Sequence, residues 1–167
     1  MDLDLTDYLP YLLNRAGARI AAAFTKEARR HGLSLQMWRV LAALNHRDGQ
    51  GVGELADTTS IDISTLSRVL DQMEQKRLVQ RRRDAEDQRN VAVWRTGSGR
   101  AATQKLLPTA RRYEAVALGG MDAAEARLLK QMLTRVYGNL DALSEPQKKS
   151  RAARAARLER VQSAAKQ

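Results

Sequence analysis

The chain contains no cysteine, and this absence excludes disulfide bonds, a thiol nucleophile and a cysteine-ligated zinc site. Aromatic residues make up 4% of the sequence, and no apolar run approaches the roughly 20 residues that span a membrane. The acidic start, Met1 to Asp4, lacks the basic region of a signal peptide. We therefore expect a cytoplasmic protein with no membrane partner.

The 167 residues are strongly basic, with 29 lysines and arginines against 19 acidic residues and a net charge of +10. Such a charge favours polyanionic partners, nucleic acid first and an acidic membrane surface second. Residues 145–167 carry seven basic and two acidic side chains, which is half of the net charge. This Ala- and Arg-rich tail is either a solvated extension or an arm that contacts phosphates.

Apolar residues spaced three or four apart predict helices in the first half of the chain. Gly32 suits the end of the first helix, and Ser34 can cap the second. Either Asp62 or Ser60 can cap the fourth helix, whose apolar side chains are Leu66, Val69, Leu70 and Met73. The first three predicted helices cover residues 6–30, the segment from Ser34 to the residue before Gly49, and residues 52–57. The fourth begins after Asp62 or Ser60 and includes Leu66 to Met73.

The pattern then changes to two short β-branched segments, residues 78–82 and 90–94, which predict a two-stranded hairpin. Thr96 can cap a helix over residues 97–118. The segment from Asp122 to Glu125 has the spacing of a capping box, which opens a last helix.

This order of elements is typical of a winged helix-turn-helix, which binds duplex DNA. A helix about 10–12 Å across fits the major groove, and the hairpin reaches the adjacent minor groove. The fourth helix is the predicted reading helix. Opposite its apolar stripe it exposes five polar side chains: Ser64, Thr65, Arg68, Asp71 and Gln72. The serine, threonine, arginine and glutamine among them can hydrogen-bond to base edges or phosphates. Ser64 and Thr65 can equally serve only to satisfy the backbone amides at the helix start.

The link between the predicted strands places four arginines around three acids, from Arg81 to Arg89. In one interpretation Asp87 holds Arg89 extended, so that its guanidinium enters the minor groove already ordered. In the other, the acids and arginines form a salt-bridged tip that contacts nothing. The helix-turn-helix order before the link favours DNA contact, with Arg82 and Arg83 as further candidates.

Residues 63–101 resemble the recognition helix and wing of the MarR family, the multiple-antibiotic-resistance regulators of bacteria. The resemblance rests on four features: the apolar pattern from Leu66 to Met73, the strand start Leu78-Val79, Asp87-Gln88-Arg89 in the wing, and Thr96 followed by Gly99. It extends over residues 6–144. It implies a homodimer whose first, fifth and sixth helices interlock and whose two winged domains bind a palindromic operator. Most members of the family repress transcription, and many release DNA when a small, often aromatic or phenolic, ligand binds.

The expected fold is mainly α with a small β-hairpin wing, a winged helix-turn-helix flanked by N- and C-terminal dimerisation helices. The apolar stripes at the two ends of the chain need covering, and a second copy of the chain covers them economically. The alternative is a monomer whose end helices pack on each other. The expected division is a dimerisation helix at 6–31, a DNA-binding domain at 34–96, dimerisation helices at 97–144 and the basic tail at 145–167.

The chain departs from the family pattern at three places. Arg77 stands where a glycine usually closes the recognition helix. A left-handed cap costs about 1 kcal/mol with a residue other than glycine, so the turn and the angle of the wing can differ there. Trp94-Arg95-Thr96 replaces the usual Leu-Thr after the second wing strand, and the basic tail is an addition.

The resemblance also implies an effector cleft between the dimerisation helices and the winged domain. Aromatic rings there would flank a planar ligand, and an arginine would pair with a carboxylate or phosphate. The start of the chain is similar to that of members that sense aromatic acids or their coenzyme A thioesters, so we expect such an effector and no bound cofactor. The candidate ligand contacts are Tyr8, Tyr11, Arg15, Arg19, His31, Trp38 and Arg39. Trp38 is equally suited to the core, and His31 to a helix end.

Two other classes of protein compete with this interpretation. For an enzyme, the chain offers His31 and His46, at separate helix ends with no acid at catalytic or metal-ligand spacing, so we expect neither catalysis nor a metal site. An architectural protein would bind all duplexes alike through its total charge and its tail, with a steep salt dependence and no preferred site.

Overall fold

The computed structural model describes residues 3–83 and 91–140. The chain divides into two units, Met1–Ala117 and Leu118–Gln167. Asp87, Arg89 and the basic tail at 145–167 lie outside the described residues, so the interpretations attached to them stay predictions.

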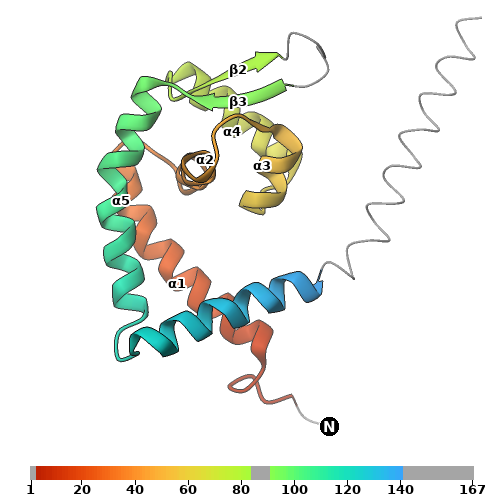
Figure 1. The fold of residues 1–167 in the computed structure, drawn as a ribbon, viewed down its shortest axis with the longest axis vertical. Helices are drawn as coiled ribbons and strands as arrows, with labels where there is room; N and C mark the ends of the chain where they lie inside the picture. Colours follow the sequence, from red (N-terminus) through yellow and green to blue (C-terminus); the bar gives the residue numbers. More distant parts are fainter. Residues whose placement is uncertain (1–2, 84–90, 141–167) are drawn as a thin grey trace, which may run out of the picture. The chain divides into compact units, whose positions relative to one another are not determined.

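The first unit is mainly helical and carries a small antiparallel sheet (Figure 1). The strands lie in the order β1-β3-β2, and Arg82 of β2 lies opposite Ala92 of β3. This is the winged helix-turn-helix that the sequence predicts. The strand β1 was missed, because two residues are too few to show a periodicity. The elements are α1 (Leu9–Arg30), α2 (Leu35–His46), β1 (Gln50–Gly51), α3 (Val52–Thr59), α4 (Ile63–Gln75), β2 (Val79–Arg83), β3 (Val91–Arg95) and α5 (Gly97–Ala117).

The junction between α1 and α2 follows the sequence prediction. At the end of α1, Gly32 has φ +70° and the Leu33 N–H donates to the Ala28 carbonyl at 3.0 Å, which is a Schellman ending. At the start of α2, the Ser34 hydroxyl oxygen accepts a hydrogen bond from the Met37 N–H at 3.1 Å. Both predicted caps are therefore confirmed.

Helix α1 begins at Leu9 rather than at the predicted Thr6. The Asp4 carboxylate accepts hydrogen bonds from the Thr6 N–H at 2.8 Å and from the Thr6 hydroxyl at 2.7 Å, which stabilises a turn ahead of the helix. Pro10 then occupies the first helical turn, where its missing N–H costs no hydrogen bond.

The core of the first unit holds α4 in a fixed orientation. All four apolar side chains predicted for its inner stripe are buried: Leu66, Val69, Leu70 and Met73. They pack in one cluster with side chains of the other elements, among them Leu41, Leu44, Leu55, Val93 and Leu106. Burying one such side chain stabilises the fold by about 1.5–3 kcal/mol. The opposite side of α4 consequently faces outward.

Helix α1 joins this core only near its C-terminal end. Phe24 and Ala28 are buried there. The apolar side chains of its earlier turns are exposed: Leu9 48%, Leu12 42%, Leu13 38% and Ile20 45%. The packing of the first unit leaves this apolar stripe uncovered.

The described part of the second unit contains a helix over residues 123–140. It opens with the predicted capping box, because the Asp122 N–H donates to Glu125 Oε2 at 2.8 Å and the Glu125 N–H donates to Asp122 Oδ1 at 2.9 Å. Five of its large apolar side chains are exposed: Leu128, Met132, Leu133, Tyr137 and Leu140. Within residues 3–83 and 91–140, no helix combines the length and the apolar character needed to cross a membrane.

Candidate nucleic-acid interface

The first turn of α4 is capped by Asp62, one of the two predicted caps. Its Oδ1 accepts hydrogen bonds from the Ser64 hydroxyl at 2.6 Å and from the Thr65 N–H at 2.9 Å. These bonds, the one from Ser64 above all, hold the pKa of the Asp62 carboxyl well below its usual range. Ser60, the other candidate, instead ends α3 in the left-handed conformation, with φ 53°.

The predicted reading residues all lie on α4. Ser64, Arg68 and Gln72 are exposed, and Thr65 is half-buried. The Ser64 hydroxyl donates a hydrogen bond to Asp62 Oδ1 and thereby supports the helix start. The Ser64 side chain is nevertheless exposed to solvent. The arrangement brings an alcohol, a guanidinium and an amide to the outward side of one helix, where they can bond to base edges.

Arg81 joins the hairpin to α4. Its backbone N–H donates to Glu74 Oε1 at 2.9 Å, and its guanidinium forms ion pairs with Asp71, at 2.7 Å, and with Glu74. Its Nη2 also donates to the Ser67 carbonyl at 3.3 Å. The sequence groups Arg81 with the arginines of the wing, but its side chain is committed to the reading helix. Asp71, a polar residue of the reading face, is thereby paired within the protein.

The next residue of β2 points the other way, because side chains alternate along a strand. Arg82 and Arg83 are exposed. The Arg82 guanidinium lies over the Trp94 ring, with its Cζ 5.6 Å from the ring centroid. These two arginines are the described residues of the hairpin that remain candidates for phosphate contact.

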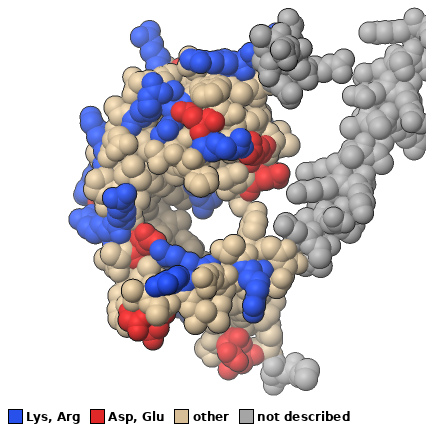
Figure 2. Space-filling model, in the orientation of Figure 1, with Lys and Arg blue, Asp and Glu red and all other residues tan. Residues whose placement is uncertain are grey.

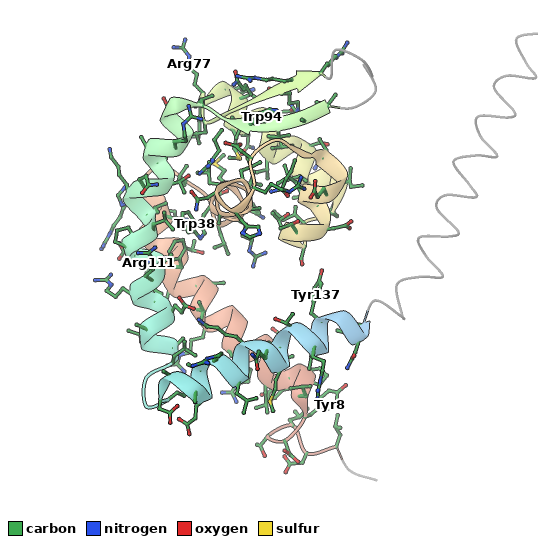
Figure 3. All side chains as sticks on the ribbon, in the orientation of Figure 1. Tyr8, Trp38, Arg77, Trp94, Arg111 and Tyr137 are labelled. Atoms are coloured by element: carbon green, nitrogen blue, oxygen red, sulfur yellow. The ribbon has the colours of Figure 1, made fainter. Side chains whose placement is uncertain are left out.

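The turn from α4 into β2 keeps the left-handed geometry although Arg77 replaces the usual glycine. Arg77 has φ 56°, and its side chain points away from the helices (Figure 3). Its N–H donates to the Glu74 carbonyl and the Leu78 N–H to the Met73 carbonyl, both at 2.8 Å. This is again a Schellman ending, with Arg77 in the left-handed position that glycine usually occupies in this motif.

The start of α5 is fastened to the same turn. The Thr96 hydroxyl donates toward the carbonyls of Arg77 and Leu78 and accepts from the Gly99 N–H at 3.1 Å, so Thr96 caps α5 as predicted. A Cβ on Gly99 would lie 2.0 Å from the Leu78 carbonyl oxygen, and only glycine allows this approach.

Arg95, which occupies the position of the usual leucine, forms polar contacts with Asp48 and Asn45. Its N–H donates to Asp48 Oδ1 at 2.9 Å, its Nε approaches Asp48 Oδ2 at 3.4 Å, and its Nη1 donates to Asn45 Oδ1 at 2.7 Å. The Arg95 side chain is 11% exposed. The two guanidinium contacts satisfy a nearly buried charge, and together with the backbone bond they hold β3 against the end of α2.

The face of the first unit seen in Figure 2 carries basic side chains around the hairpin and along α5, with acidic side chains between them. A basic surface of this kind suits a polyanion. Among residues 3–83 and 91–140, no three His, Asp or Glu side chains gather as metal ligands would.

The candidate effector residues lie on α1, on α2 and at the two ends of α1. Arg15 lies over the Tyr11 ring, with its Cζ 5.4 Å from the centroid. Tyr8 is 41% exposed at the N-cap of α1, and His31 is exposed at its C-cap. Arg19 on α1 and Arg39 on α2 are exposed.

Trp38 belongs to an aromatic cluster that joins three helices. Its ring lies 5.3 Å from Phe24 of α1, and Phe24 meets Tyr113 of α5 edge-on at 5.8 Å. The Tyr113 hydroxyl donates to the Ala23 carbonyl at 3.4 Å. Trp38 is half-buried and packs against the core. Phe24 belongs to the apolar pattern that predicts the first helix, whereas Tyr113 was missed, although it follows Leu106 and Ala110 at helical spacing.

Comparisons with known proteins agree with this geometry. Residues 33–91 match the sequence profile of the MarR family. The HTH-type transcriptional repressor NicR of Pseudomonas putida is 28% identical over 133 residues, which are 80% of this chain and 84% of that protein. A MarR family transcriptional regulator from Silicibacter pomeroyi superposes with a TM-score of 0.77 at 33% identity, covering 84% of this chain and 97% of that one. Bordetella bronchiseptica BpsR, whose DNA binding is regulated by 6-hydroxynicotinic acid, superposes with a TM-score of 0.69 at 26% identity, covering 77% of this chain and 98% of that one.

Proposed function

Because the chain belongs to the MarR family of transcriptional regulators, we propose that it is a sequence-specific repressor. In this proposal a homodimer binds a palindromic operator. A small aromatic acid or its coenzyme A thioester binds to the homodimer and releases it from the DNA. The observation that carries the proposal is the outward polar side of α4, joined through Arg81 to a hairpin whose β2 strand bears Arg82 and Arg83. A regulator that binds chromosomal DNA acts in the cytoplasm, where we expect this protein.

In this proposal α4 enters the major groove. Residues near the start of such a helix contact base edges, so Ser64, Thr65 and Arg68 are the first readers, with Gln72 beyond them. Arginine suits a guanine edge and glutamine an adenine edge. Arg82 and Arg83 contact phosphates, and Arg89, ordered by Asp87, enters the minor groove.

The exposed apolar side chains support the homodimer. The stripe on α1 from Leu9 to Ile20 and the apolar residues of the helix at 123–140 are exposed in the single chain. A second copy buries such stripes at little cost in polar desolvation. A two-fold dimer then sets its two reading helices about 34 Å apart, one turn of DNA, and predicts a palindromic site.

Two observations support an aromatic acid as the effector: the types of side chain among the candidate contacts, and the ligand of a similar protein. Aromatic and cationic side chains recur on α1 and α2, and a planar acid binds to such a combination. BpsR, at 26% identity, is regulated by 6-hydroxynicotinic acid, an aromatic acid.

Selection of bound sites from random duplexes, followed by fluorescence anisotropy with the selected and a scrambled duplex, tests the DNA-binding proposal. A repressor of this type should prefer one palindrome by a factor of about 1,000 or more. Equal affinity for both duplexes would reject sequence-specific regulation and favour the architectural alternative.

The dimer and the effector have their own tests. Sedimentation of the full chain should give a dimer, and Leu12→Asp should weaken it, whereas Asn14→Asp on the same helix should not. Titration of aromatic acids and their thioesters against the labelled operator should release DNA. Arg15→Met should weaken that response, and Arg111→Met, whose side chain points away from α5 in Figure 3, should leave it unchanged. Unchanged operator affinity with every compound would indicate a constitutive repressor.

A further inference from the structure

On the outer face of the sheet, Arg82, a phosphate contact in the DNA-binding proposal, lies beside two side chains that this proposal has not used, Gln80 and Trp94. Gln80 and Trp94 are paired in the β2–β3 register, and Arg82 lies two residues along β2 from Gln80, on the same face. The Arg82 guanidinium lies over the indole of Trp94, 5.6 Å from the ring centroid. We refer to Gln80, Arg82 and Trp94 as the arginine platform.

The platform holds the Arg82 guanidinium by its face and by one edge. With the Gln80 carboxamide oriented to satisfy both groups, its oxygen accepts from Arg82 Nη2 at 2.6 Å and from Nε at 3.2 Å. Neither this pair of bonds nor the ring contact uses Nη1. A guanidinium has five N–H donors in a rigid fork, so the remaining edge keeps donors that match two oxygens of a phosphate.

The position of Trp94 is also restricted by Gly49, which precedes β1 on the edge of β3 opposite β2. Gly49 has φ +75° and donates its N–H to the Val93 carbonyl at 3.1 Å, next to the indole. A Cβ on Gly49 would lie 2.4 Å from the ring, so the indole occupies the space that any other residue would fill. Trp94 as a whole residue is still 36% exposed, which is unusual for a tryptophan whose role is only to fill a core.

We propose that Trp94 is a positioning residue for DNA binding: with Gln80 it holds the Arg82 guanidinium ready to contact a phosphate of the duplex. The inference rests on the proposed function only in requiring that the winged domain binds DNA. A phosphate contact fits better than a base contact, because Arg82 lies on the hairpin beside α4 rather than on the helix that enters the groove. Immobilising a free arginine on binding lowers affinity by about 2- to 12-fold, and the platform removes that loss.

The test measures the coupling between Trp94 and Arg82 in DNA binding. Anisotropy titrations over a range of salt concentrations compare the wild type with Arg82→Ala, Trp94→Leu and the double variant, on the selected operator and on a scrambled duplex. Arg82→Ala should reduce the salt slope by about 0.9, the value for one lost phosphate contact. Trp94→Leu should weaken binding by about 2- to 12-fold when Arg82 is present and have no effect when it is alanine. The change in salt slope and the loss of affinity should each be the same on the operator and on the scrambled duplex, because a phosphate contact does not depend on base sequence.

Two further variants separate positioning from folding. Trp94→Phe keeps an aromatic face and should retain most of the affinity. Gln80→Met removes the carboxamide oxygen that accepts from Arg82 and leaves the indole and Gly49 unchanged. It should lower the affinity for DNA only when Arg82 is present.

An equal loss from Trp94→Leu in both backgrounds, or an unchanged salt slope in Arg82→Ala, would overturn the proposal. Loss of selectivity between operator and scrambled duplex would instead reject the sequence-specific repressor, while the coupling on either duplex would still stand.

Discussion

Arg81 Nη1 lies 2.7 Å from Asp71 Oδ1, so a strand residue of the wing is ion-paired with the polar side of the reading helix. The same guanidinium also pairs with Glu74, and the Arg81 N–H donates to that carboxylate. The position of the wing relative to α4 is therefore set by charged hydrogen bonds as well as by the apolar core. A regulator that must place a helix and a hairpin on one duplex depends on such a link.

We expect Arg81→Met to lower the free energy of unfolding by about 1–2 kcal/mol. Hydrogen bonds between charged groups contribute about 1.5–3 kcal/mol, and this value is reduced here because the Asp71 side chain is 60% exposed. The variant also leaves Glu74, which is half-buried, without this partner. Urea unfolding followed by circular dichroism measures the change.

Arg83→Met is the matched control, since Arg83 lies on the same strand and is exposed. It should change stability by less than about 0.5 kcal/mol. If both variants lost the same stability, the ion pairs of Arg81 would not be what joins the hairpin to α4.

We expect Arg77→Gly to stabilise the protein by about 1 kcal/mol. Arg77 has φ 56°, a left-handed conformation that disfavours a residue with a Cβ, and glycine removes that strain. The thermal midpoint and the urea midpoint should both rise. Lys76→Gly, one residue earlier at φ −79°, gains nothing from glycine and should be neutral or destabilising. A fall in stability for Arg77→Gly would show that the arginine side chain contributes contacts that outweigh the backbone strain.

We expect Gly99→Ala to destabilise the protein by about 1–3 kcal/mol, the cost of forcing an atom into a packed site. The new Cβ would lie 2.0 Å from the Leu78 carbonyl oxygen, a backbone atom that cannot move without disturbing the turn after α4. Gly97→Ala is the control, because nothing lies within 4 Å of a Cβ at that position. Equal stability of the two variants would mean that α5 does not approach the turn as closely as described.

The starts of α2, α4, α5 and the helix at 123–140 were predictable from the sequence, because single capping side chains decide them. Ser34, Asp62, Thr96 and the pair Asp122 and Glu125 each form the capping bond that their position predicts. The apolar stripe of α4 was predictable for a similar reason, since its spacing fixes which side meets the core.

The roles of the wing arginines were not predictable from the sequence alone. Arg81 and Arg82 are neighbours in one basic run, yet the pleat of β2 sends Arg81 to Asp71 and Glu74 and sends Arg82 to Trp94. Alternation predicts that they face opposite sides of the strand. It does not say which side holds an acid, because those partners come from other elements.

We expect Arg68→Ala to weaken binding to the operator by about 1–3 kcal/mol and to relax the preference at one base pair. Arg68 is exposed on the outward side of α4, one turn beyond Ser64, where a guanidinium can reach the edge of a guanine. Site selection with the variant, compared with selection by the wild type, identifies the position that loses its preference. Gln75→Ala, exposed near the far end of the same helix, should leave the selected site unchanged. If Arg68→Ala instead weakened operator and scrambled duplexes equally, Arg68 would contact a phosphate, and the reading of bases would fall to Ser64, Thr65 and Gln72.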